Sequence, residues 1–175
     1  PGKRKVKQST QFIVGAAGEA DRDIVKYTAR LYDGLHLNRV YFSAYQRSTD
    51  TEPLWSEPKL SHKRSDLLTR EHRLYQVDFL LRKYGFDGSE IVFDREGKLC
   101  LETDPKEAWA KSHPEFFPKN PNIASKEALL RVPGLGPITV SRIVKRRGQG
   151  KITSIEDIGK VTARLRKAQN YLTFY

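Results

Sequence analysis

The sequence predicts an α/β segment followed by an all-α module, and three observations carry this prediction. Two strand-like stretches flank a helix-like stretch within residues 10–45. Short helical patterns surround a tight Pro-Gly-x-Gly turn within residues 122–175. Positive charge is concentrated in that second region, where eleven Lys and Arg face three Asp and Glu, a net +8 of the chain's total +11. The fold class we expect is a partial parallel βαβ unit joined to a helical module.

The βαβ unit is expected over residues 1–47. Residues 10–14 (TQFIV) and 38–45 (NRVYFSAY) are rich in β-branched and aromatic residues, which favours strands. Residues 21–35 predict a helix with acidic residues in its first turn. Its apolar residues at helical spacing are Ile24, Tyr27, Leu31 and Leu35. Strands joined through a helix pair in parallel, so the two strands should be neighbours in one sheet.

Residues 48–121 are interpreted as a loop and helical linker region. The polar stretch 46–68 predicts a long loop. A helix is expected over residues 69–84, with Thr69 as its N-cap and Gly85 at its end.

Two shorter elements follow in this linker region. The apolar triplets at 91–93 and 99–101 flank DREG, which predicts a small hairpin. Another helix should begin at Pro105 and end before Pro114, because the residue before a proline avoids helical geometry.

The module over residues 122–175 is expected to be built around two helices. Ser125 can cap a helix over residues 126–131, and Pro137 suits the first position of a helix over 137–147. The residues expected near the inner side of the second helix are Ile138, Ser141, Ile143 and Val144. Between the helices, Pro133–Gly136 should form an exposed turn.

This turn is the candidate binding site. Two glycines remove side chains where the backbone must bend and approach another group. Amides of the turn and of the following helix then point outward together, and with the helix dipole they favour an anion. The candidate DNA-binding residues are Gly134, Leu135, Gly136, Thr139, Arg142, Lys145 and Arg146. A tight helical turn that binds no ligand is the alternative interpretation.

The stretch VPGLGPITVSRIV resembles the helix-hairpin-helix motif, in which an apolar residue, Pro-Gly, an apolar residue and Gly precede a helix. Val132 and the four residues Pro133–Gly136 match this pattern. The resemblance implies that hairpin amides bind a DNA phosphate without reading base sequence. Ile138 and Val140 depart from the pattern, because the family often has a basic and a small residue there.

The N-terminal segment FIVGAAGEADRD resembles a late strand of a radical-SAM barrel and the turn after it. The resemblance implies that Gly15, Gly18 and Glu19 lie near bound S-adenosylmethionine. The order of segments along nearly the whole chain is similar to the C-terminal part of the radical-SAM proteins of DNA modification or repair. That family implies a partner resembling uracil-DNA glycosylase.

The cysteine content departs from this family. Cys100 is the single cysteine, whereas a 4Fe–4S cluster with an open iron needs three thiolates. The interpretation is a C-terminal fragment, with S-adenosylmethionine and the cluster expected only together with an N-terminal part. No catalytic residue and no metal-ligand set is predicted within this chain.

The function that the sequence predicts is therefore sequence-independent DNA binding. Two alternatives stay open: a stand-alone nucleic-acid-binding module for RNA or branched DNA, and a helical hairpin that docks a protein. No apolar run approaches the ~20 residues that span a bilayer, so no membrane partner is expected. A single cysteine fits a reducing compartment, and the expected location is cytoplasmic and nucleoid-associated.

Overall fold

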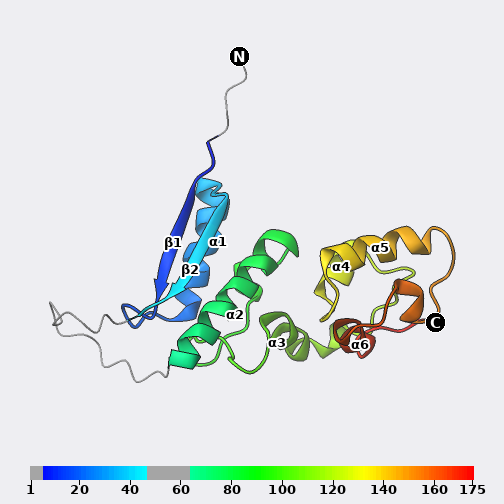
Figure 1. Cartoon of the computed structure of the whole chain (residues 1–175). Coiled ribbons are helices and arrows are strands. Elements are labelled where there is room, and N and C mark those ends of the chain that lie inside the picture. The colour runs from blue at the N-terminus through cyan, green and yellow to red at the C-terminus, as the bar shows by residue number, and fades with distance from the viewer. Residues whose placement is uncertain (1–5, 47–63) are drawn as a thin grey trace, which may run out of the picture. The chain divides into compact units, whose positions relative to one another are not determined.

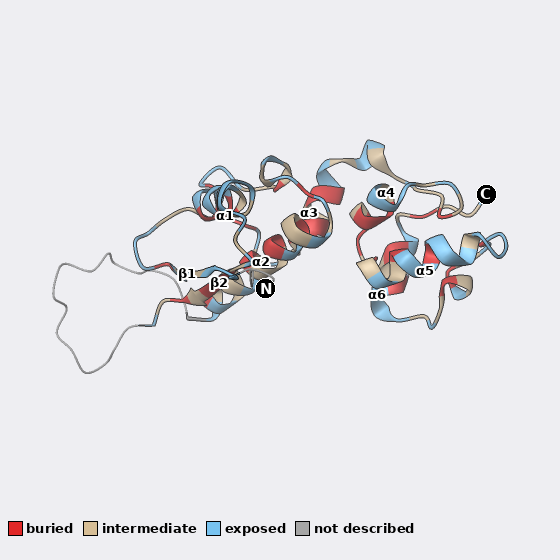
Figure 2. Ribbon diagram, turned by 90° about the horizontal axis from the view of Figure 1, so that it is seen from above, coloured by how far each residue is buried: buried red, intermediate tan, exposed pale blue. Residues whose placement is uncertain are grey.

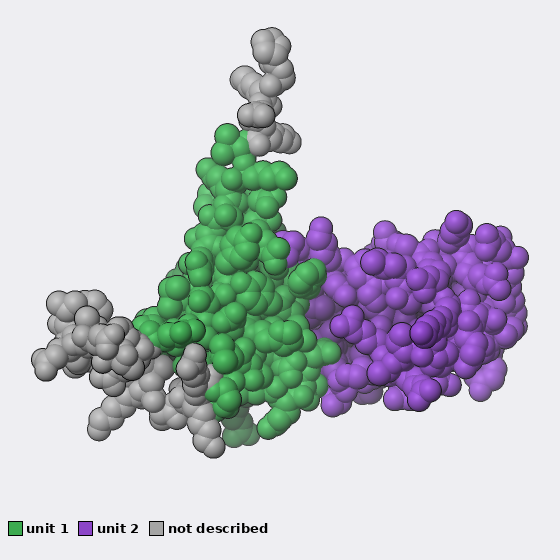
Figure 3. All heavy atoms as spheres, in the orientation of Figure 1, with its two compact units in different colours: residues 1–79, 87–105 green, residues 80–86, 106–175 purple. Residues whose placement is uncertain are grey.

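The computed structural model describes residues 6–46 and 64–175. The chain divides into two compact units, which Figure 3 colours separately. Unit 1 comprises residues 1–79 and 87–105, and unit 2 comprises residues 80–86 and 106–175. Most of the predicted loop over 46–68 lies outside the described residues.

Unit 1 contains the predicted βαβ arrangement. β1 (Ser9–Val14) is followed by α1 (Asp21–Leu35) and β2 (Arg39–Ala44), and the two strands lie side by side (Figure 1). They pair in parallel, with Ser9 opposite Arg39 and Val14 opposite Ala44. The prediction of a parallel βαβ unit is confirmed.

The core of unit 1 lies against one face of this sheet. Val14, Val40 and Phe42 are buried there, and α1 adds Ile24 and Val25. The predicted inner face of α1 was partly wrong. Tyr27 and Leu35 share the helical spacing of Ile24 but are more than half exposed, because the buried stripe turns toward Val25 and Thr28.

Helical side chains close the outer edge of β2. Every second backbone N–H along this edge donates to a side-chain oxygen. The bonds run from Val40 to Tyr32 Oη (2.9 Å), from Phe42 to Tyr75 Oη (3.2 Å) and from Ala44 to Glu71 Oε2 (2.7 Å). The Tyr75 hydroxyl also donates to the Phe42 carbonyl at 2.9 Å, as a neighbouring strand would. The sheet therefore ends at β2, protected from further pairing.

α2 (Arg64–Lys83) begins earlier than the sequence predicts. Thr69 is not its N-cap: the residue lies inside the helix, where its hydroxyl donates to the Ser65 carbonyl. The segment 64–68 contains no Gly or Pro, so the helix extends back through it. The predicted end is confirmed, since Gly85 has a φ of +69° and the Phe86 N–H reaches back to the Leu80 carbonyl.

The predicted hairpin over residues 91–101 was wrong, because no strand forms in this described stretch. Only its tight turn exists, closed by the bond from the Asp94 N–H to the Lys98 carbonyl. The backbone beyond the turn finds partners at the start of α1 instead. Leu99 N–H donates to the Asp21 carboxylate, and the Gly97 carbonyl accepts from the Arg22 N–H.

Unit 2 is helical and contains α3 (Pro105–Ser112), α4 (Lys126–Arg131), α5 (Pro137–Arg147) and α6 (Ala163–Gln169). The predicted bounds of α4 and α5 are confirmed, and the Ser125 hydroxyl accepts from the Ala128 N–H as a cap. Its core residues, red in Figure 2, come from α4, α5, α6 and the loops beside them.

The stretch 106–121 packs within unit 2, so the predicted division at residue 121 differs from the observed one. Lys119 forms a bridge to Leu172, with backbone bonds to Tyr171 and Thr173 near the end of the chain. Trp109 of α3 packs edge-on against Phe116 and Phe117. The contacts of Lys119 therefore tie the stretch to the C-terminal end of the chain.

Candidate nucleic-acid interface

The turn between α4 and α5 is held from inside the module. Pro133 and Leu135 are buried, while Gly134 and Gly136 are only partly exposed. The prediction of an exposed turn was therefore partly wrong. Leu135 directs its side chain into the core, where it is 1% exposed, so this candidate binding residue offers a ligand only its backbone.

Gly134 is needed for packing within the protein. Its φ is +86°, and a Cβ there would lie 2.1 Å from the Arg164 carbonyl oxygen and 3.0 Å from the Ala168 nitrogen. The close approach that the glycine permits is therefore to α6. The sequence predicted a close approach to some group but did not identify the backbone of α6.

Gly136 has a different environment. Its φ of −105° and ψ of 170° are open to any residue, and an added Cβ would meet only the Tyr84 hydroxyl at 3.5 Å, an ordinary contact. It is the N-cap of α5, and no side chain caps the helix there. A glycine at this position leaves the helix terminus uncovered.

Four backbone N–H groups around this terminus have no acceptor within the described parts of the chain. They belong to Gly134, Gly136, Ile138 and Thr139. The first amide of α5 to bond within the chain is that of Val140, which donates to the Gly136 carbonyl at 2.9 Å. Unbonded amides at the positive end of a helix dipole suit a phosphate oxygen.

Exposed basic side chains continue along α5 from this terminus. Arg142, Lys145 and Arg146 are all exposed. Arg142 and Lys145 stand four and seven positions after Ile138, so these two basic residues share one face of the helix with Ile138. Arg147 is excluded from this face, because its guanidinium donates to the Ala124 carbonyl at 2.6 Å.

The inner side of α5 differs from the prediction. Its buried residues are Val140 and Ile143. Ile143 was expected there, but Ile138 is 79% exposed, and Ser141 and Val144 are exposed as well. The helix begins at Pro137, so the first turn, with Ile138, projects beyond the core. An apolar side chain therefore stands directly beside the unbonded amides.

Two features near the turn lie outside the predicted DNA-binding residues. α6 packs behind the turn and carries exposed Arg164 and Arg166, which extend the positive charge. Lys106 of α3 donates from Nζ to the Leu135 carbonyl at 2.6 Å. The basic composition of α6 was visible in the sequence, whereas nothing local connects Lys106 with a turn about 30 residues later.

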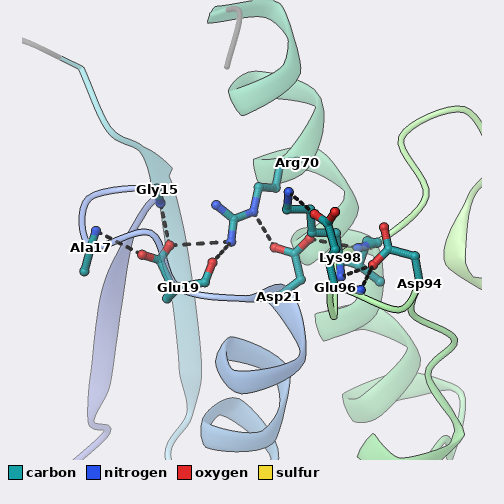
Figure 4. Close-up of polar contacts among 9 residues, drawn as sticks. Gly15, Ala17, Glu19, Asp21, Arg70, Asp94, Glu96 and Lys98 are labelled. Carbon is teal, nitrogen blue, oxygen red and sulfur yellow. Dashed lines mark hydrogen bonds and ion pairs between the residues drawn. The ribbon is translucent and has the colours of Figure 1, made fainter. Parts of the chain in front are cut away.

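The predicted cofactor residues Gly15, Gly18 and Glu19 lie together in the loop between β1 and α1, as Figure 4 shows for Gly15 and Glu19. The Glu19 carboxylate accepts from the Gly15 N–H at 2.5 Å and from the Ala17 N–H at 3.0 Å. Arg70 of α2 donates to the Glu19 carbonyl at 2.6 Å. The Glu19 carboxylate therefore stabilises the loop to which it belongs by accepting hydrogen bonds from the loop's own backbone.

The start of this loop is enclosed, whereas Gly18 is exposed with open space beside it. Gly15 is buried, and a Cβ there would lie 3.0 Å from Leu67 Cδ2. The Arg70 guanidinium bonds the Asp21 carboxylate beside it (Figure 4). Both oxygens of the Glu19 carboxylate are thus engaged by the backbone of this loop, and a cofactor near them would have to share or displace these partners.

An iron–sulfur cluster is likewise not supported by the residues of this chain. Cys100 is exposed and is the single cysteine of the sequence. Within the described residues, no group of His, Cys, Asp or Glu is arranged to hold a metal ion.

No protein-family model, curated protein or solved structure matches this chain. No helix in the described residues is both long enough and apolar enough to cross a membrane. The assignment of function therefore depends on the geometry of the hairpin.

Proposed function

We propose that unit 2 binds the phosphate backbone of DNA through the α4–α5 hairpin, without reading base sequence. One observation carries this proposal. The N–H groups of Gly136, Ile138 and Thr139 have no acceptor within the described residues and lie at the N-terminus of α5. Such groups are normally satisfied by a cap, by water or by a ligand, and Gly136 provides no side-chain cap.

The chemistry of the site follows from these donors. A phosphate oxygen accepts from the amides, and the Thr139 hydroxyl stands next to them in the first turn of α5. Lys145 and Arg146 lie in the last turn of the same helix, and in this proposal they contact neighbouring phosphates. Contacts from backbone amides and basic side chains to phosphates position a protein on nucleic acid but carry no sequence information.

We further propose that this chain serves a DNA modification or repair protein of the radical-SAM type, acting beside a partner that resembles uracil-DNA glycosylase. The parallel βαβ unit supports this proposal. The edge of β2 is closed and does not support it, so a further strand would have to add beside β1. Radical chemistry would need S-adenosylmethionine and a 4Fe–4S cluster held by other residues than those described above.

The binding proposal is tested by fluorescence anisotropy with two duplexes of unrelated sequence, a branched duplex and a single-stranded RNA. The variant Lys145→Ala/Arg146→Ala removes two exposed charges from α5. Lys26→Ala/Arg30→Ala removes two exposed charges from α1 and is the matched control. Both pairs change the net charge equally, so a difference between them locates the interface.

We expect the two duplexes to bind with similar affinity and the α5 variant to bind severalfold more weakly than the α1 variant. The log–log salt slope should fall by about 0.9 for each phosphate contact that is lost. If the chain prefers RNA or the branched duplex, the proposed ligand changes from ordinary duplex DNA to RNA or to branched DNA. Absence of binding to all four probes would reject the proposal and favour a protein-docking hairpin.

A further inference from the structure

Lys106 occupies an unusual position for a lysine. The residue stands in the first turn of α3, where the helix dipole disfavours a positive charge, and it is only 8% exposed. Burying an ammonium group is costly unless polar partners replace its water. Its partners therefore indicate what the buried charge does.

Two of these partners are the Leu135 carbonyl in the hairpin turn and the ring of Tyr84. Nζ donates to the Leu135 carbonyl at 2.6 Å, a charge-assisted bond at the centre of the turn. Nζ also lies 4.6 Å from the centroid of the Tyr84 ring. The Tyr84 hydroxyl is in turn the nearest group to the open side of Gly136. Lys106 thus contacts the turn from behind.

We propose that Lys106 is a positioning residue of the phosphate site, which rests on the proposed function of the hairpin. Its bond fixes the Leu135 carbonyl inward, and this orientation directs the adjacent Gly136 amide away from the core. The lysine does not touch the phosphate. Its effect is to hold the amides in their binding geometry and to place a positive charge behind them.

The sequence alone suggests a different role for this residue. A lysine in a polar helix is normally a solvated surface charge. Lys111, one turn and a half later in α3, is closer to this pattern, since its side chain is 59% exposed and pairs at 3.4 Å with Glu107 of the same helix. The two lysines carry the same charge on the same helix, so Lys111 provides a matched control.

The experiment compares the full chain with its Lys106→Met, Lys106→Arg and Lys111→Met variants in DNA binding at several salt concentrations. We expect Lys106→Met to weaken binding about tenfold, the scale of one lost charge-assisted hydrogen bond. Lys106→Arg should restore most of the affinity, and Lys111→Met should change it less than about twofold. The salt slope of Lys106→Met should stay at the wild-type value, because no phosphate contact is lost.

A folded Lys106→Met variant with wild-type affinity would overturn the inference while leaving the proposed function intact. Failure of the wild-type chain to bind DNA would instead reject the proposed function. If Lys106→Met does not fold, the inference is tested on the wild-type chain by NMR of the Lys106 side chain. The ¹⁵Nζ signal of Lys106 should be protected from solvent exchange and should shift when DNA binds. A rapidly exchanging or unshifted signal would contradict the inference.

Discussion

Two glycines in one turn differ in what they contribute. Gly134 has a left-handed φ, and its missing Cβ leaves room for the Arg164 carbonyl. Gly136 has an extended conformation with space around it. The first glycine is therefore required by the fold, while the second keeps the amides of the α5 terminus accessible.

We predict that Gly134→Ala lowers the free energy of unfolding by about 2 kcal/mol or more, because the substitution adds both backbone strain and a clash with α6. Gly136→Ala should lower it by less than about 1 kcal/mol. Urea unfolding followed by circular dichroism measures both. Equal stability of the two variants would show that the turn does not pack on α6 as described.

Gly136→Ala should nevertheless weaken DNA binding, since its methyl group stands among the amides that receive the phosphate. Anisotropy on the folded variant measures this loss. The substitution keeps every charge, so a weaker affinity with an unchanged salt slope is expected. Binding as tight as that of the wild type would mean that no phosphate approaches this amide.

Among the elements, the edge of β2 depends on α2. Tyr75 both donates to and accepts from the Phe42 backbone, and its ring packs edge-on against the Phe42 ring at 5.2 Å. We predict that Tyr75→Phe lowers the free energy of unfolding by about 1–3 kcal/mol, because two backbone groups lose their partner. Tyr27→Phe, on the exposed side of α1, is the control and should have no measurable effect.

Chemical denaturation of both variants decides this prediction. The ring of Tyr75 is kept, so packing is preserved and the loss reports on the hydroxyl. If Tyr75→Phe is as stable as the control, water replaces the hydroxyl at the strand edge, and the closure of β2 by α2 contributes little.

α3 and α6 are joined by an ion pair. Lys167 Nζ lies 2.6 Å from Glu107 Oε2, and the hydrogen bond from Lys167 is the main reason why the pKa of Glu107 is below its usual 4.5. A carboxyl whose pKa is lowered on folding adds stability above its unfolded pKa. That contribution is lost as the pH falls through the folded value.

We therefore predict that Glu107→Gln lowers the melting temperature at pH 7, and that this difference shrinks as the pH falls through the lowered pKa of Glu107, where the wild-type carboxyl takes up a proton. Lys167 is 42% exposed, so the effect at pH 7 should be below about 1 kcal/mol. Thermal unfolding at pH 7, 5 and 3 measures it. A difference that does not shrink between pH 7 and pH 3 would assign the loss to packing rather than to charge.

At the scale of the whole molecule, the sequence predicted elements whose signals are local. The bounds of α1, α4 and α5 follow from apolar spacing, a serine cap and a proline at the first helical position. The parallel pairing of β1 and β2 follows from the helix between them. Each of these features is decided within a few tens of residues.

Features that depend on distant partners could not be predicted. The segment 91–101 looks like a hairpin, yet Leu99 bonds Asp21, which is 78 residues away. Ile138 continues the apolar pattern of α5 but projects beyond the core. Lys106 reads as a surface charge, although it is buried under the hairpin turn. The candidate site could therefore be located from the sequence, but not the contacts that shape it.

The central claim is that the backbone amides of the α4–α5 hairpin receive a nucleic-acid phosphate. The most direct measurement is a ¹H–¹⁵N NMR titration of the whole chain with two short duplexes of unrelated sequence. The account predicts that the largest amide shifts occur at Gly136, Ile138 and Thr139 and are the same for both duplexes. Shifts confined to other residues, or amide shifts at the hairpin that differ between the two sequences, would contradict it.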